Sequence, residues 1–88
     1  MAKFMCTHTV PPGKMTEEQL RQFAIAAQQD STVKGYRSFA NLSKGKAICV
    51  VEGPNEEAVA GWFQKMAMPY DSITRVELEG DRGAVQRA

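Results

Sequence analysis

The stretch that decides the fold is KAICVVEGPNEEAVAGWFQKMAMPYDSI, residues 46–73. It reads as a strand over residues 47–52, a turn, an amphipathic helix, a stop at Pro69 and the start of another strand. The helix begins at Gly53 or at Asn55, either of which can cap it. One stripe at three- and four-residue spacing forms its buried face: Val59, Trp62, Phe63 and Met66. The strand is apolar on both faces, so each face of its sheet needs a cover.

Three more strands are predicted around that stretch. They cover residues 3–10, residues 33–42 with a bulge at Gly35, and residues 71–78. A turn containing Gly45 joins the second strand to the third as a hairpin. Alternate side chains of the first strand point to one face: Phe4, Cys6, His8 and Val10.

A further helix is predicted between the first two strands. Thr16 and Gln19 have the spacing of a capping box, in which each side chain bonds the backbone amide of the other residue. The buried face predicted for this helix consists of Leu20, Phe23, Ala24 and Ala27. Ile25 falls on the opposite, outward side.

The order β-α-β-β-α-β predicts an α+β domain of the ferredoxin-like class, with one antiparallel sheet and both helices on one face. The domain covers residues 1–78, and residues 79–88 form a polar C-terminal tail that only Val85 could anchor. Leaving the other sheet face in water would forgo about 1.5–3 kcal/mol for each large apolar side chain. We therefore expect a homodimer whose sheets pack face to face, as in a dimeric α/β barrel.

Composition limits which partners and which cellular compartment are expected for this chain. The chain has 88 residues, 24% of them charged, and a net charge of +1, so we expect no binding to nucleic acid or to anionic membranes. It has no apolar run of membrane-spanning length and no signal peptide core, so we expect a cytoplasmic protein. In the cytosol, Cys6 and Cys49 read first as small buried residues, with a cross-strand disulfide or a shared metal as alternatives.

Three segments, KFMCTHTVPPG, CVVEGPNEEAV and YDSITRVE, resemble a family of short bacterial ferredoxin-like proteins of mostly unknown function, some of which bind nickel. The resemblance spans residues 3–78 and implies the dimeric assembly. It also implies metal-binding histidines near the end of the first strand and along both helices. Only the first of these family histidines is present in this chain, as His8. Phe63 and Ala67 occupy the matching places in the second helix, and the first helix has no histidine. We therefore expect no cofactor. A nickel or other transition-metal ion would have three candidate donors, Cys6, His8 and Cys49.

The single histidine is the centre of the candidate site, because any imidazole chemistry must pass through it. Cys6 lies two residues from His8 on the same strand face, and a nucleophilic pair would need the two side chains in hydrogen-bond contact. Antiparallel pairing also brings Tyr70 near the end of the first strand. The ligand-binding candidates are His8, Tyr36, Trp62 and Tyr70. For each of them the alternative is ordinary core packing.

Three functions remain open at this point. The chain is a small-molecule or metal-binding protein, a cofactor-free oxygenase or isomerase, or an accessory subunit with no small-molecule site. The sequence does not decide whether the chain is an enzyme, and it names no catalytic residue. A pocket lined by Trp62 and Tyr70, with His8 facing into it, would favour the first two functions. A solid core at that place would favour the third.

Overall fold

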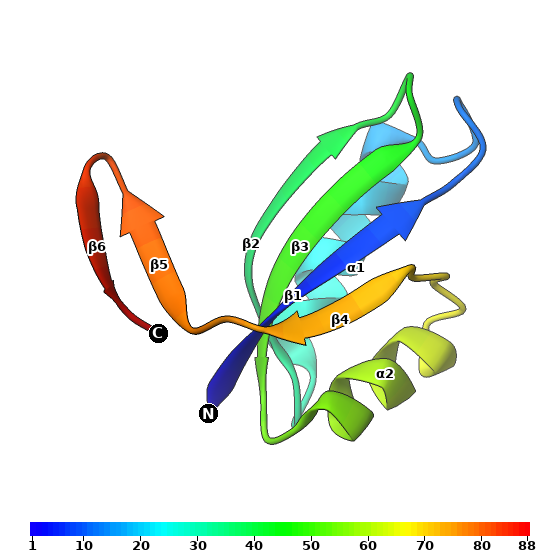
Figure 1. Ribbon diagram of the computed structural model, residues 1–88. Helices are drawn as coiled ribbons and strands as arrows, with labels where there is room; N and C mark the ends of the chain where they lie inside the picture. The colour runs from blue at the N-terminus through cyan, green and yellow to red at the C-terminus, as the bar shows by residue number, and fades with distance from the viewer.

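The sheet at the centre of the molecule has four antiparallel strands in the order β2-β3-β1-β4 (Figure 1). The computed structural model describes residues 1–88 throughout. Along the chain the elements are β1 (Ala2–Thr9), α1 (Glu17–Gln29), β2 (Lys34–Asn41), β3 (Lys46–Gly53), α2 (Glu56–Lys65), β4 (Ser72–Arg75), β5 (Leu78–Asp81) and β6 (Ala84–Arg87). The first six elements and the place of β3 between β1 and β2 confirm the predicted α+β ferredoxin-like fold.

Both helices begin at polar caps. Thr16 accepts a hydrogen bond from the amide of Gln19, and the Gln19 side chain accepts one from the amide of Thr16, so the predicted capping box is present. Of the two caps that the sequence allowed for α2, the structure has Asn55, whose side-chain oxygen accepts from the amide of Ala58. Neither helix combines the length and the apolar character needed to cross a bilayer.

The core lies between the sheet and the two helices. The strands pair Cys6 with Cys49 and Phe4 with Val51, so these alternate residues face the helices together. The register shifts between Gly35 and Arg37, which confirms the bulge predicted in β2. Nine buried apolar side chains form the core: Phe4, Cys6, Ala27, Val33, Val51, Val59, Trp62, Phe63 and Met68.

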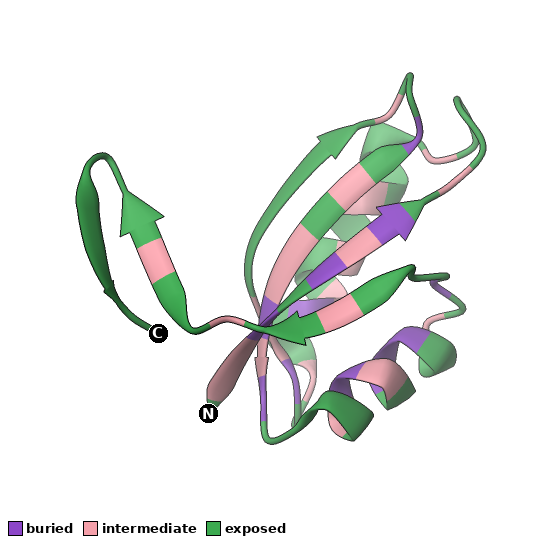
Figure 2. Ribbon diagram, in the orientation of Figure 1, coloured by how far each residue is buried: buried purple, intermediate pink, exposed green.

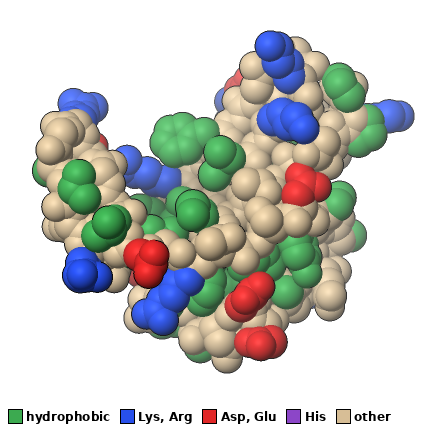
Figure 3. Space-filling view, in the orientation of Figure 1, with side chains coloured by type: hydrophobic (Ala, Val, Ile, Leu, Met, Phe, Trp, Pro, Cys, Tyr) green, Lys and Arg blue, Asp and Glu red, His purple; other side chains and the backbone are tan.

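The opposite face of the sheet carries no helix, and we call it the bare face. The strand register places Phe39 and Ile48 side by side on it, and Met5 lies beside Val50 two residue pairs further along β3. Phe39 is 66% exposed, Ile48 49% and Met5 44%. Figure 3 looks onto this side of the molecule, where hydrophobic side chains gather over the strands. The prediction that the helices cover only one face is therefore confirmed.

The end of the chain differs from the prediction. The last strand of the sheet stops at Arg75 instead of continuing to Leu78, and the predicted tail forms most of a hairpin, β5–β6. Arg82 and Gly83 turn the hairpin with φ values of 52° and 90°, the pair of positive angles that a two-residue type I′ turn requires. The physical reason for the shorter strand is that the chain leaves the sheet after β4 and begins a separate pairing.

The hairpin stands away from the sheet and is almost wholly exposed (Figures 1 and 2). Its main tether is an ion pair of 2.8 Å between Lys3 of β1 and Glu79 of β5. Lys3 also lies over the ring of Tyr36, 4.2 Å from its centroid. Leu78 and Val85 are 58% and 69% exposed, so the hairpin buries little apolar surface of its own.

Replacing Gly61 with alanine should stabilise the fold by about 1 kcal/mol, because glycine is the poorer helix former. Gly61 is exposed in α2, and an added Cβ would meet no atom within 4 Å. Gly53→Ala is the matched control, since its Cβ would lie 3.1 Å from a methyl group of Val59 and crowd the core. Urea unfolding measures both variants, and a destabilised Gly61→Ala protein would contradict the assignment of an open helix surface.

Candidate functional site

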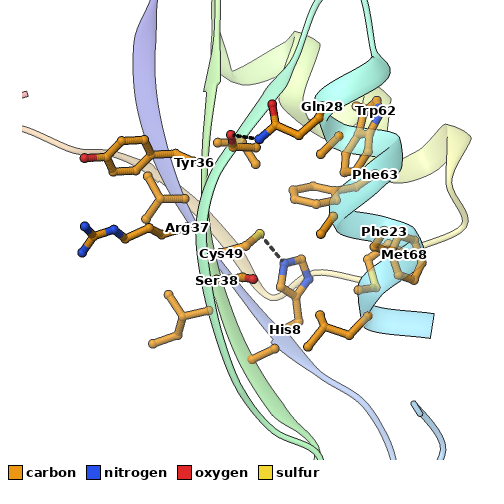
Figure 4. Close-up of a pocket in the computed structure, with 18 residues that line it drawn as sticks. His8, Phe23, Gln28, Tyr36, Arg37, Ser38, Cys49, Trp62, Phe63 and Met68 are labelled. Carbon is orange, nitrogen blue, oxygen red and sulfur yellow. Dashed lines mark hydrogen bonds between the residues drawn. The ribbon is translucent and has the colours of Figure 1, made fainter. Parts of the chain in front are cut away.

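A cavity of about 240 Å³ lies between α1, α2 and the helix-covered face of the sheet (Figure 4). It is lined by 18 residues, 13 of them hydrophobic. Small side chains leave this space open, because Ala24 and Ala27 of α1 line it opposite Ser38 and Ala47 of the sheet. Ala24 was predicted to be buried. It is exposed, since the surface that it should pack against is the cavity.

His8 lines the cavity near the end of β1, and its side chain is only 3% exposed. Its Nδ1 lies 2.8 Å from the carbonyl oxygen of Pro69, which can only accept, so Nδ1 carries a hydrogen and donates it. Its Nε2 lies 3.1 Å from the Sγ of Cys49. The Pro69 carbonyl thereby fixes the ring and aims Nε2 at the thiol, with the ring of Phe63 packed edge-on against it at 4.9 Å.

Cys49 lines the cavity on β3, directly opposite Cys6 on β1. A hydrogen bond from Cys6 and the contact with His8 lower the pKa of Cys49 to about 6, against the opposing effect of burial. Cys6 is fully buried, and the same hydrogen bond together with burial raises the pKa of its thiol above the ordinary value. The pair therefore combines an acidic, cavity-facing thiol with a protonated thiol beneath it.

His8 can carry a positive charge that offsets the negative charge of a Cys49 thiolate. Burial lowers the pKa of His8, but Cys49, the Pro69 carbonyl and the charge of Asp71 together raise it above its ordinary value. The carboxylate of Asp71 is itself fixed by a hydrogen bond of 2.6 Å from Thr9. The contact between Cys49 Sγ and His8 Nε2 is thus the arrangement that activates nucleophilic cysteines, because the imidazole can accept the thiol proton and stabilise the thiolate.

The structure places three of the four predicted ligand-site residues along the cavity, namely His8, Tyr36 and Trp62. Trp62 of α2 lines it together with His8, whereas Tyr70 packs on the outer side of Phe63, with ring centroids 5.7 Å apart. Tyr36 lies along the cavity wall, but its ring points to the other side of the sheet with Arg37 (Figure 4).

The sequence suggested Cys6 as the nucleophilic partner of His8 and placed Cys49 near His8 only as a candidate metal donor, whereas the direct contact is with Cys49. The Cys6 sulfur lies in the same strand as His8, 3.7 Å from the Phe4 carbonyl oxygen, while Cys49 reaches His8 from the neighbouring strand. The available signal was the register of β1 and β3, which sets His8 diagonally across from Cys49. A pocket beside His8 and Trp62 was left open as an alternative to a solid core, and the alanines at Ala24 and Ala27 on one helix face were a signal for it that went unused.

Two comparisons with known proteins find relatives. The sequence pattern of a family described as "Nickel responsive protein SCO4226-like" matches residues 4–76. The crystal structure of SCO4226 from Streptomyces coelicolor A3(2) is similar, with a TM-score of 0.74 and 30% sequence identity over 90% of this chain and all of that one. Among curated proteins none matches the chain. The family match ends before β5, so the hairpin lies outside it.

The residues of this chain do not fit the nickel ion that the family description implies. No three side chains among histidine, cysteine, aspartate and glutamate come together in a metal-binding group. His8 already uses both ring nitrogens, one on the Pro69 carbonyl and one on Cys49. Of the predicted donors, Cys49 lies against His8 and opposite Cys6, but His8 is engaged by the Pro69 carbonyl and by Cys49 rather than held open for an ion.

Proposed function

This chain belongs to the SCO4226-like family of nickel-responsive proteins, and from that premise we propose that it binds a small, mainly apolar molecule in the cavity beside His8. One observation carries the proposal: a largely hydrophobic cavity has the polarised Cys49–His8 pair in its wall. A solid core at this place would have favoured an accessory subunit without a ligand. The proposal requires no metal.

The size and lining of the cavity define the ligand class. A volume of about 240 Å³ is below the range of about 300–1,000 Å³ that holds drug-sized ligands. A single aromatic ring or a short alkyl chain matches this space, and Trp62 and Phe63 supply aromatic walls. One hydrogen-bonding group on the ligand would reach the Ser38 hydroxyl, which can donate or accept.

We also propose that the working form is a homodimer in which the bare faces of two copies pack together. Three large side chains support this form, because Met5, Phe39 and Ile48 remain between 44% and 66% exposed on one sheet face. A small domain with so much open apolar surface gains stability from a second copy. The dimer leaves the cavity accessible, since the cavity lies on the other side of the sheet.

The cytoplasm is the compartment that we propose. The proposal rests on the use of the cysteines, since Cys6 serves as a small buried core residue, as is usual in a reducing compartment.

Benzoate tests the cavity, with Trp62 as the reporter. Trp62 is the only tryptophan and lines the cavity, so its fluorescence should change on titration with benzoate. For a ligand this small we expect a dissociation constant on the order of 1 mM. Ala24→Leu should weaken binding at least about tenfold, because the larger side chain fills the space.

Ile25→Ala is the matched control, since it changes the outward side of the same helix turn, where the side chain is 56% exposed. It should bind benzoate as the parent chain does. A fluorescence response that survives in Ala24→Leu, or none in the parent chain with benzoate and benzyl alcohol alike, would overturn the assignment of the cavity as the ligand site.

A further inference from the structure

Two thiols of opposite character meet at the floor of the cavity. Cys49 lines the cavity and is partly exposed, while Cys6 lies directly across the β1–β3 pairing and is completely buried. A reagent that enters the cavity therefore reaches Cys49 first. Cys6 is within reach only of what has already formed on Cys49.

We propose that Cys49 and Cys6 are a redox pair, in which Cys49 reacts with a hydroperoxide and Cys6 then closes a cross-strand disulfide. This activity goes beyond the binding function proposed above and needs the cavity only as an entry path. The geometry of three groups carries it: the Cys49 sulfur at the cavity, the His8 Nε2 3.1 Å from that sulfur, and Cys6 opposite.

The first step is a displacement on oxygen. The Cys49 thiolate attacks the terminal oxygen of the hydroperoxide, a sulfur–oxygen bond forms, and the oxygen–oxygen bond breaks. The leaving alkoxide takes a proton from the His8 imidazolium and departs as an alcohol. His8 can act as that acid because its Nδ1 stays bonded to the Pro69 carbonyl while Nε2 faces the reacting sulfur.

The second step forms the disulfide. The Cys6 sulfur attacks the sulfur of the Cys49 sulfenic acid, and the hydroxyl group leaves as water with the thiol proton of Cys6. Overall, two thiols are oxidised by two electrons, and one hydroperoxide is reduced to one alcohol and one water. An external thiol, such as glutathione, returns the pair to the reduced state.

The backbone already allows this bond. Residues that face each other in an antiparallel pair have Cα atoms about 4.5–5.5 Å apart, inside the range of about 4.4–6.8 Å found for disulfides. Cys6 and Cys49 are such facing residues. Oxidation therefore needs only rotation of the two side chains, with no movement of either strand.

Mass spectrometry tests the proposal on the full chain. The reduced protein is treated with one equivalent of cumene hydroperoxide, quenched with N-ethylmaleimide and digested. We expect a peptide pair joined through Cys6 and Cys49 and no labelled thiol. In Cys6→Ser, oxidation should stop at the Cys49 sulfenic acid, which dimedone traps. A disulfide between two chains, or Cys6 and Cys49 both still labelled by N-ethylmaleimide after the treatment, would overturn the proposal.

His8→Asn tests the positioning of the thiolate. The asparagine amide can keep the hydrogen bond to the Pro69 carbonyl but cannot reach Cys49, so we expect oxidation at neutral pH to slow about tenfold. Trp62 fluorescence reports whether the variant is folded. Failure of this chemistry leaves the benzoate titration unaffected, so the redox proposal and the binding proposal fail separately. An unchanged oxidation rate in folded His8→Asn would remove His8 from the mechanism.

Discussion

Ile48→Lys should be a monomer at micromolar concentration, under conditions where the parent chain is a dimer. Ile48 lies on β3 near the middle of the bare face, between Phe39 of β2 and Thr7 of β1. In the proposed dimer both protomers contribute this same face, so one substitution places two ammonium groups in an apolar interface. Burying each unpaired charge costs about 2 kcal/mol or more, so the dissociation constant of the dimer should rise about a thousandfold.

Ile25→Lys is the matched control for that experiment. Ile25 is 56% exposed on the outward side of α1 and Ile48 is 49% exposed on the sheet, so the two changes are alike in chemistry and in initial exposure. Only the Ile48 variant should dissociate. Native mass spectrometry and light scattering across the micromolar range measure the oligomer directly. A parent chain that stays monomeric, or an Ile48→Lys chain that stays dimeric, would exclude pairing through the bare face.

The fold followed from the sequence because its determinants are local. Thr16 and Gln19 mark a helix start by their spacing alone, and Gly35 marks the bulge that the structure has. Strand order then followed from the handedness of the two crossovers, which leaves one arrangement for β3. Each of these signals acts within a few residues or through a general rule of chain connection.

The hairpin was missed because its turn lacks the usual residues. A type I′ turn favours asparagine or aspartate followed by glycine, whereas here Arg82 adopts the first positive φ before Gly83. The surrounding residues are polar, so no alternation of apolar side chains marked the two strands. Without those signals the segment reads as a tail.

The candidate site was predicted only in part, because its contacts join distant parts of the chain. His8 and Trp62 were identified as members, yet the cavity that they share exists because Ala24 and Ala27 are too small to fill it. Whether two alanines mean close packing or empty space depends on how far the helix stands from the sheet. Periodicity describes which side of a helix is apolar and contains nothing about that distance.

The pH dependence of Cys49 alkylation should have a midpoint near pH 6, the pKa of its thiol. The thiolate is the reacting form, so the rate should rise about tenfold per pH unit below the midpoint and level off above about pH 7. An ordinary thiol, with a value of 9.0, would still be rising throughout this range. Iodoacetamide labelling, read on the Cys49 peptide by mass spectrometry, measures the profile.

The pH midpoint of Cys49 alkylation tests the lowered pKa of the thiol better than the alkylation rate does. At pH 6 the thiolate of Cys49 should be about 500 times more abundant than that of an ordinary thiol, but its lower basicity makes each thiolate about 16 to 30 times less nucleophilic. The net advantage is about 20-fold at pH 6 and reverses above about pH 7.6. Partial burial multiplies the whole curve by one factor, so it changes the height of the curve and leaves its midpoint in place.

Substitutions of the neighbouring residues show which groups lower the pKa of Cys49. Cys6→Ala removes the first hydrogen bond that stabilises the Cys49 thiolate, and His8→Asn removes the second together with its positive charge. Each should move the midpoint to higher pH, because less stabilisation of the charged form raises the pKa of the thiol. Asp71 acts on Cys49 only through His8, so Asp71→Asn should move the midpoint in the same direction but less. A midpoint that remains near pH 6 in both Cys6→Ala and His8→Asn would mean that neither group activates Cys49.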